Sequence, residues 1–300
     1  MRERFVSVTS ELLESNPRTA LVLADISAAA FEPARVRHPD RVINVGIREQ
    51  LMLGVASGLS LTGLRPIAHS YAPFLVERAF EQVKLDLGHQ QASAILVSVG
   101  ASYDWTQGGY THHSPGDVAV LSTLPGWTIH VPGHPDEMEA LLRQAVASDD
   151  LVYIRLTQRA NSAAHLPDGH QANGRIHLVR PGSKALVVAV GPMLDPVLTA
   201  VSDLDVAVAY TTTVRPFDHV GLRQAAPSSD IVLVEPYVAG TSAAEVNLAL
   251  ADRPHRLLSL GTNNRELRRY GTPREHDVAH GLDPAGLRRS IVDFLTSSVS

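Results

Sequence analysis

A carboxylate stands at a predicted junction between a strand and a helix. The sequence there is GIREQ (46–50), in which a glycine allows the chain to turn before Glu49 opens the helix. An acidic residue in the first helical turn is favoured by the helix dipole, which is a purely structural reason for Glu49. The small residues Gly54, Ala56 and Gly58 let neighbouring elements approach the helix closely. A glutamate packed in this way is partly desolvated, and such a carboxyl group suits proton transfer.

Two aromatic residues lie at the next predicted junction. Tyr71 and Phe74 follow a short strand at 67–69, in a chain where aromatic residues make up only 5%. Such residues often belong to a core, but two rings at a junction also offer a surface on which a flat heteroaromatic ring stacks. Arg78 follows within the next predicted helix and is a candidate for a substrate or interface contact.

A glycine-rich loop at 108–117 carries two adjacent histidines, His112 and His113. Histidine is a common zinc ligand, but consecutive positions are poorly placed to hold one ion together. No carboxylate pair with a suggestive spacing accompanies them. We therefore predict no metal site built from the residues of this chain.

The composition excludes several kinds of site and partner. The chain has 300 residues, 44% hydrophobic and 19% charged, which is enough apolar material for two cores. It has no cysteine, so disulfides and thiol catalysis are excluded and a cytoplasmic protein is expected. The net charge of −5 argues against nucleic acid or an anionic membrane as the main partner. Residues 1–10 do not resemble a signal peptide, and no segment approaches the roughly 20 apolar residues that span a bilayer.

Short apolar runs alternate with longer amphipathic stretches, which predicts parallel sheets covered by helices on both faces. The predicted strands are 19–25, 41–46, 67–69, 93–99, 127–131, 152–156, 184–190, 206–210 and 230–235. The predicted helices are 48–61, 73–87, 135–147 and 284–295. The expected fold class is therefore α/β, with two doubly wound domains.

The segment 157–182 differs from its surroundings. It is rich in glycine, proline and asparagine and has few long apolar runs, which indicates a linker with room for a short hairpin. We predict a first domain at 1–160, a linker at 161–182 and a second domain at 183–300. Both domains would then have a typical size.

The chemical segments, in this order, resemble the transketolase family. Segment 46–50 resembles the glycine-hydrophobe-arginine-glutamate motif of transketolases and deoxyxylulose phosphate synthases, and 109–112 resembles their glycine-x-threonine-histidine loop. Segments 213–218 and 233–235 resemble turns of the family's C-terminal domain. The resemblance covers essentially the whole chain. It corresponds to the C-terminal subunit of a split transketolase, a pyrimidine-binding domain followed by the transketolase C-terminal domain.

This resemblance implies thiamine pyrophosphate as cofactor and suggests a role for each motif residue. Glu49 would hydrogen-bond N1′ of the aminopyrimidine and promote the proton transfer that activates the cofactor. Tyr71 and Phe74 would form the pocket against which the pyrimidine packs. His112 would face the thiazolium and contact substrate oxygens, while His113 would support the loop.

The same resemblance makes three arginines candidate substrate contacts. Arg155 and Arg159 lie near the end of the first domain, where the family often supplies a phosphate-binding arginine. Arg78 lies on the helix that follows the pyrimidine pocket.

The loop departs from the family pattern at two glycines. Family members that use sugar phosphates often have an aspartate where this chain has Gly108, and a phosphate-contacting histidine where it has Gly100. Neither glycine can contact a sugar hydroxyl or a phosphate through a side chain. We therefore expect a substrate other than the usual pentose phosphates, or a relaxed preference. Trp105 and Tyr110, on the same loop, are expected to fill the space left behind.

The motif that holds the cofactor's diphosphate is missing. Thiamine pyrophosphate enzymes bind it through Mg²⁺, using a glycine-aspartate-glycine motif followed by an asparagine. Here the Gly-Asp pair at 116–117 continues into Val118, and the Asp-Gly pair at 168–169 lies in the predicted linker. We therefore expect a separate N-terminal transketolase subunit to supply the diphosphate and Mg²⁺ site, in an α2β2 heterotetramer.

Two other functions remain open from the sequence. The β subunit of a 2-oxoacid dehydrogenase shares the two-domain layout and a similar glutamate. The glutamate and histidine motifs favour instead the transfer of a two-carbon ketol unit between ketose and aldose-type substrates. A non-catalytic scaffold subunit would explain Gly100 and Gly108, but the retention of Glu49 and His112 counts against it.

Overall fold

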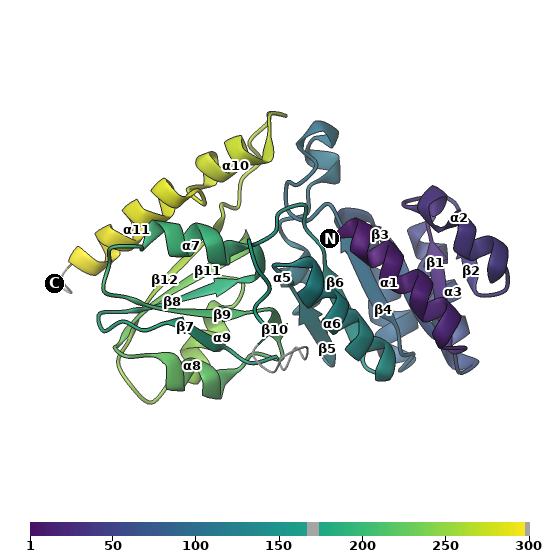
Figure 1. Ribbon diagram of the computed structural model, residues 1–300, viewed down its shortest axis with the longest axis horizontal. Helices are drawn as coiled ribbons and strands as arrows, with labels where there is room; N and C mark the ends of the chain where they lie inside the picture. The colour runs from purple at the N-terminus through teal and green to yellow at the C-terminus, as the bar shows by residue number, and fades with distance from the viewer. Residues whose placement is uncertain (167–173, 298–300) are drawn as a thin grey trace.

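Two sheets stand side by side in the molecule (Figure 1). The computed structural model describes residues 1–166 and 174–297. The mainly parallel strands and the helices that cover them confirm the predicted α/β fold class. The predicted division into domains stays a proposal, and residues 167–173 of the predicted linker lie outside the described part. Within the described ranges, no helix is long and apolar enough to cross a bilayer.

The first sheet supplies the edge on which the candidate site is built. Its strands are β1 (Thr19–Leu23), β2 (Val42–Asn44), β3 (Arg65–Tyr71), β4 (Ile95–Val99), β5 (Trp127–His130), β6 (Leu151–Arg155) and β10 (Thr213–Arg215). They lie in the order β10-β5-β6-β4-β3-β1-β2, parallel except for β10. β1 and β4 are buried along their whole length, as expected of strands packed on both faces.

Helices cover both faces of this sheet. One face carries α1 (Arg2–Ser15), α2 (Ala28–Arg37) and α6 (Pro135–Ala147). The other face carries α3 (Glu49–Leu61), η1 (Pro73–Arg78), α4 (Phe80–Gln82), η2 (Val83–His89) and α5 (Asp117–Leu121). The single helix predicted at 73–87 is thus three helical segments, and η1 and η2 have the wide turns of a π-helix. Such turns are rare and are often found at functional sites.

The second sheet is smaller and shares a core with the first. Its strands are β7 (His177–Arg180), β8 (Leu186–Val190), β9 (Ala207–Thr211), β11 (Asp230–Val238) and β12 (Arg256–Thr262), in the order β12-β11-β8-β9-β7. Its helices are α7 (Leu194–Ala200), α8 (His219–Ala225), α9 (Ala243–Ala249), α10 (Pro273–His280) and α11 (Pro284–Thr296), with a 3₁₀ turn, η5, at Gly191–Met193. α8 and α9 pack on the face whose apolar core is continuous with that of the first sheet, while α7 and α11 cover the opposite face.

Several elements were not predicted from the sequence. They include α1, although Phe5, Val8 and Leu12 have helical spacing and are buried. β7 lies within the predicted linker and pairs antiparallel with β9. β10, which was interpreted as part of a turn, crosses to the first sheet and pairs antiparallel with β5. These pairings join segments that are distant in sequence, so no local pattern indicates them.

The carboxyl ends of β2, β3 and β4 bring three loops to one edge of the first sheet. In parallel α/β sheets this edge is where binding sites form. The loop after β2 leads into α3, the loop after β3 leads into η1, and the loop after β4 contains the 3₁₀ turns η3 (Thr106–Gly108) and η4 (Tyr110–His112). The three segments that carry the candidate site residues Glu49, Tyr71 with Phe74, and His112 are therefore neighbours in space.

Candidate active site

Glu49 is a buried carboxylate at the first residue of α3. Gly46 has a φ of +71°, which lets the chain turn from β2 into the helix. Only 1% of Glu49 is exposed. Ser70 Oγ donates a hydrogen bond to Glu49 Oε1 at 3.0 Å, and Arg78 Nη1 donates to Oε2 at 2.8 Å. Each carboxylate oxygen therefore has a donor, and the guanidinium compensates a charge that burial would otherwise disfavour.

Aromatic rings form a wall next to this ion pair. Tyr71 and Trp105 are stacked, with ring centroids 5.2 Å apart and planes inclined by 15°. Phe74 stands edge-on to Tyr71 at 6.2 Å. The centroid of the His112 imidazole lies 5.0 Å from that of the Phe74 ring and 4.5 Å from that of the Trp105 ring, so His112 completes the group. We call Tyr71, Phe74, Trp105 and His112 the aromatic wall.

Arg78 joins the carboxylate to the wall. Its guanidinium carbon lies 4.0 Å from the centre of the Phe74 ring, while one of its nitrogens donates to Glu49. The Arg78 carbonyl accepts a hydrogen bond from Gln50 Nε2 at 3.3 Å, so η1 and α3 are held together at this point. A flat cation here satisfies a carboxylate with its edge and an aromatic ring with its face.

The loop between β4 and α5, residues 100–116, which we call the histidine loop, fixes the orientation of the His112 ring. His112 Nδ1 lies 3.2 Å from the Gly108 carbonyl and 3.0 Å from Thr111 Oγ1. Because a carbonyl only accepts hydrogen bonds, we assign the proton to Nδ1, which puts the lone pair of the neutral ring on Nε2. Nε2 makes no hydrogen bond to any described residue, so it is available to a substrate oxygen.

His113 turns to the opposite side of the same loop. Its ring meets the edge of His276, from α10, at 5.5 Å. Burial, and next the neighbouring His276 and His112, lower the pKa of His113 to about 4. Ser114 Oγ donates to Glu77 Oε1 at 2.6 Å and ties the loop to η1. His113 thus contacts α10 on the side of the loop away from His112, and its supporting role stays a prediction.

The two unusual glycines lie where a side chain would collide. A Cβ on Gly108 would stand 2.9 Å from Cε3 of Trp105, and a Cβ on Gly100 would stand 2.7 Å from Cδ1 of Tyr71. Trp105 therefore occupies the space next to Gly108, as the sequence suggests. Tyr110 does not, because 61% of it is exposed and it lies outside the aromatic wall.

Arg155 lies inside the protein, which does not fit the substrate contact predicted for it. Its side chain is 1% exposed. Nε donates to Asp117 Oδ2 at 2.7 Å, and Nη2 donates to Ser102 Oγ at 2.7 Å. The Tyr153 hydroxyl donates to the same Asp117 oxygen at 2.7 Å. This buried network anchors both ends of the histidine loop to β6, so we assign Arg155 to the support of that loop.

Arg159 also has a partner within the chain. Its Nη1 donates to Asp277 Oδ1 at 2.7 Å, and its guanidinium carbon lies 5.5 Å from the Tyr103 ring centre. It thereby connects the end of the first sheet to α10. Of the three arginines predicted at the site, only Arg78 lies beside Glu49.

The contacts of three residues in or next to the site, namely Ser70, Trp105 and Asp117, were not predicted from the sequence. Ser70 bonds to Glu49, and nothing in the local sequence distinguishes it from any other serine at the end of a strand. Trp105 was expected only as bulk, although a tryptophan in a glycine-rich loop is itself a signal. Asp117 was considered as part of a Gly-Asp pair, and its partner Arg155 is remote in sequence.

The site matches one end of thiamine pyrophosphate and not the other. A buried carboxylate beside aromatic rings matches the hydrogen-bonding edge and flat faces of an aminopyrimidine. A diphosphate needs a metal ion or several cations. The described residues contain no group of three or more His, Asp or Glu side chains placed to hold a metal ion. This chain thus fits the ring end of the cofactor.

Known proteins of similar sequence support this interpretation. The pyrimidine-binding domain of transketolase matches residues 1–162. A protein of the fasciation locus of Rhodococcoides fascians, described by its mass of 33.6 kDa, is 49% identical over 295 residues, 97% of this chain and 93% of that protein. One subunit of the apulose-4-phosphate transketolase of Actinobacillus succinogenes is 32% identical over 224 residues, 73% of this chain and 71% of that protein.

A solved structure extends the similarity to the whole fold. A split-gene transketolase, described as an inactive β4 tetramer, superimposes with a TM-score of 0.84. The match covers 98% of this chain and 97% of that chain, at 25% sequence identity. The chain therefore belongs to the transketolase family, where it corresponds to the C-terminal subunit of the split enzymes.

Proposed function

We propose that this chain is a subunit of a thiamine pyrophosphate-dependent, transketolase-like enzyme that transfers a two-carbon ketol unit. The observation that carries the proposal is the buried Glu49 carboxylate beside the aromatic wall, with His112 at its edge. The relative from A. succinogenes, which is named as part of a transketolase, supports the reaction class. The cofactor, when bound, supplies the electron sink for cleaving and forming the carbon–carbon bond.

The residues of this chain would divide the remaining tasks. Glu49 would hold a proton at N1′ of the pyrimidine, because its buried carboxylate offers an oxygen acceptor at the edge where the ring would bind. Tyr71 and Phe74 would orient the ring by stacking. His112 Nε2 would exchange a proton with a substrate hydroxyl, and Trp105 would keep water away from that face.

Arg78 would have to move when the cofactor binds. Its guanidinium engages the Glu49 carboxylate and the Phe74 face, the two surfaces that we propose for the pyrimidine. A flat, hydrogen-bonding cation is thus an internal substitute for the ring. Since 38% of the Arg78 side chain is exposed, it has a path to solvent or to a partner chain.

We further propose that a partner subunit supplies the diphosphate and Mg²⁺ site and that an α2β2 assembly is active. Ile47 and Leu51, on either side of Glu49, are 69% and 49% exposed. Large apolar side chains exposed beside a buried functional group suit a surface that another chain covers. The β4 tetramer of the split-gene transketolase, described as inactive, also supports the need for a partner.

The isolated chain should therefore bind thiamine pyrophosphate weakly and transfer no ketol unit. Adding the partner subunit and Mg²⁺ should restore both properties, because the diphosphate then gains its metal ion. Calorimetry would measure cofactor affinity, and a coupled assay would measure ketol transfer; a redox assay with a 2-oxoacid would test the dehydrogenase alternative. Tight, Mg²⁺-dependent cofactor binding by the chain alone would contradict the proposal.

We also propose a substrate that differs from the usual pentose phosphates, because Gly108 and Gly100 offer no side chain to a hydroxyl or a phosphate.

Gly108→Ala should lower kcat/KM by about tenfold, since overpacking typically costs about 1–3 kcal/mol and would displace His112 or Trp105. A Cβ on Gly108 would stand 2.9 Å from Cγ of His112 and 2.9 Å from Cε3 of Trp105. Gly116→Ala is the matched control on the same loop, because its Cβ would meet no atom within 4 Å.

The measurement is a panel of donors and acceptors on the reconstituted complex, run with the parent and both variants. The panel should include xylulose 5-phosphate with ribose 5-phosphate as the usual pair. Efficient turnover of that pair by the parent would refute the proposal of an unusual substrate. Equal activity of Gly108→Ala and Gly116→Ala would refute the steric argument.

A further inference from the structure

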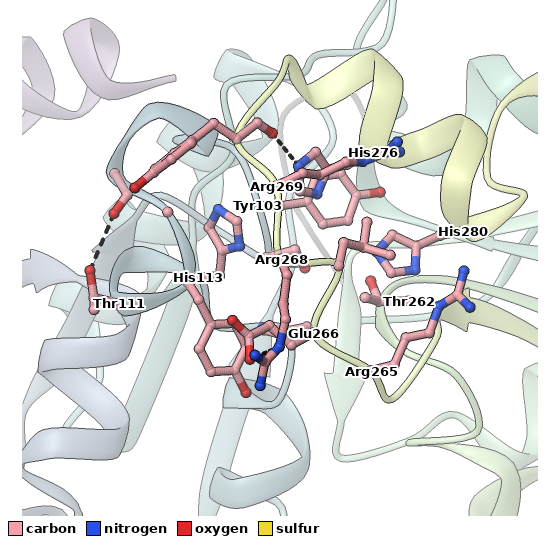
Figure 2. A pocket seen from close by; sticks show the side chains of 17 residues that line it. Tyr103, Thr111, His113, Thr262, Arg265, Glu266, Arg268, Arg269, His276 and His280 are labelled. Carbon is pink, nitrogen blue, oxygen red and sulfur yellow. Dashed lines mark hydrogen bonds and ion pairs between the residues drawn. The ribbon is translucent and has the colours of Figure 1, made fainter.

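A cavity lies between the histidine loop and an arm of the second sheet. The arm, residues 263–271, follows β12 and reaches the loop, as the view of the whole chain also shows (Figure 1). The cavity has a volume of about 440 Å³. Figure 2 shows its lining, which comes from the loop, the arm and α10. His112 does not line it, so the cavity stands behind the loop, away from the aromatic wall.

Cationic and imidazole side chains dominate this lining. They are Arg265, Arg268, Arg269, His113, His276 and His280, against one lining carboxylate, Glu266. Glu266 Oε2 lies 3.6 Å from Nε of Arg268, whose side chain is 84% exposed. An ion pair this long and this exposed contributes little free energy. The side chain of Arg265 makes no hydrogen bond or ion pair with any residue in the described ranges. At neutral pH the positive charge of the lining therefore comes from its three arginines, which outnumber the single carboxylate, while the imidazoles contribute neutral hydrogen-bonding groups.

Buried polar atoms in the lining lack partners. Thr262, which is 3% exposed and lines the cavity, has a hydroxyl with no hydrogen-bond partner among the described residues. His113 Nε2 is buried and equally unpaired within this part of the chain. A buried polar group without a partner is costly, and a bound ligand, ion or water is one way in which native proteins satisfy it.

His280 adds another donor. The Asn263 backbone N–H donates to His280 Nδ1 at 3.1 Å, which leaves the ring proton on Nε2. Burial, followed by the charges of His276, Arg265 and Arg269, lowers the pKa of His280 to about 4. An anion in the cavity would offset these neighbouring positive charges.

The arm is held in place by contacts that leave the cavity open. His276 Nε2 donates to the Tyr270 carbonyl at 2.6 Å, and Arg269 donates to the Glu275 carbonyl at 2.9 Å. Thr106 Oγ1 donates to the Gly271 carbonyl at 2.6 Å, which ties the arm to the loop that carries His112. An occupant of the cavity would thus contact the loop from behind.

We propose that this cavity binds a small molecule through a phosphate group. Guanidinium groups, a hydroxyl and imidazole N–H donors are the groups that recognise a phosphate dianion. The phosphate belongs either to the tail of a substrate or to a separate effector. Binding of the phosphate itself does not depend on the ketol-transfer function proposed above.

The test uses the full chain and inorganic phosphate, with chloride at the same ionic strength as the control salt. Calorimetry and NMR of the histidine ring protons should show saturable binding that perturbs the signals of His113 and His280. Arg265→Gln and Thr262→Val should each weaken binding about tenfold, because each removes a donor to a charged group. Arg223→Gln should bind as the parent does, since Arg223 pairs with Asp252 on the surface and does not line the cavity.

Binding that never saturates, or equal weakening by Arg223→Gln, would overturn the proposal. The reconstituted complex then identifies the source of the phosphate. If it is a substrate tail, Arg265→Gln should raise KM only for phosphorylated substrates, and inorganic phosphate should compete with them. If it is an effector, inorganic phosphate should change kcat without competing.

Discussion

Replacing Glu49 by glutamine should lower the turnover of the reconstituted complex by about 10²–10⁴-fold, the usual contribution of a general acid–base group. The amide is nearly isosteric and can still hydrogen-bond to Ser70 and to the pyrimidine. It cannot hold or release the proton at N1′. The affinity for the cofactor should fall much less than kcat, because stacking on Tyr71 and Phe74 is retained. Steady-state kinetics and cofactor titration of the same preparation separate these two effects.

The matched control for this substitution is Glu81→Gln, an exposed glutamate on α4. It removes the same charge from a neighbouring helical segment without touching the site. Thermal unfolding of both variants would show whether the fold is intact. Near-full activity of Glu49→Gln would show that Glu49 only begins a helix and pairs with Arg78.

Breaking the ion pair between Asp117 and Arg155 should produce the largest loss of stability. Arg155→Met leaves the Asp117 carboxylate buried without its charge partner, and such a change typically costs about 3–5 kcal/mol. Both side chains are at most 1% exposed, so water cannot replace the lost partner. The free energy of unfolding, measured by urea denaturation with circular dichroism, should fall by this amount.

Two further variants make this result specific. Arg143→Met removes a surface arginine that pairs with Glu11 and Glu139, and surface pairs contribute only about 0–1 kcal/mol. The double variant Arg155→Met with Asp117→Leu should lose less stability than the sum of the two single variants, because no unpaired charge remains. If Arg155→Met costs no more than Arg143→Met, the buried network does not support the histidine loop as we infer.

Local sequence patterns explain which elements and which site residues were predictable. The strands that are buried on both faces are apolar in sequence, so β1, β4 and β8 were predicted close to their observed positions. Glu49 follows a glycine at the end of a strand, and the helix starts within one residue of its predicted position. The histidine loop was recognised by glycines and histidines that are adjacent in the chain.

Long-range contacts explain what was missed. From the sequence, Arg155 is an arginine near the end of a strand with no acidic residue next to it in the chain. Only the packing of the histidine loop places Asp117 against it. The same holds for Arg78, whose partners Glu49 and Phe74 come from different elements.

The sequence by itself determined the alternation of strands and helices, the α/β class and the residue types available for chemistry, because these depend on local periodicity and turn residues. Only the tertiary structure decided which arginine reaches the site, which strand crosses between the sheets, and that an arm of the second sheet closes a cationic cavity behind His112. These outcomes depend on the pairing of segments that lie far apart in the chain. Such pairing is set by the packing of whole elements and leaves no signal in a short stretch of sequence.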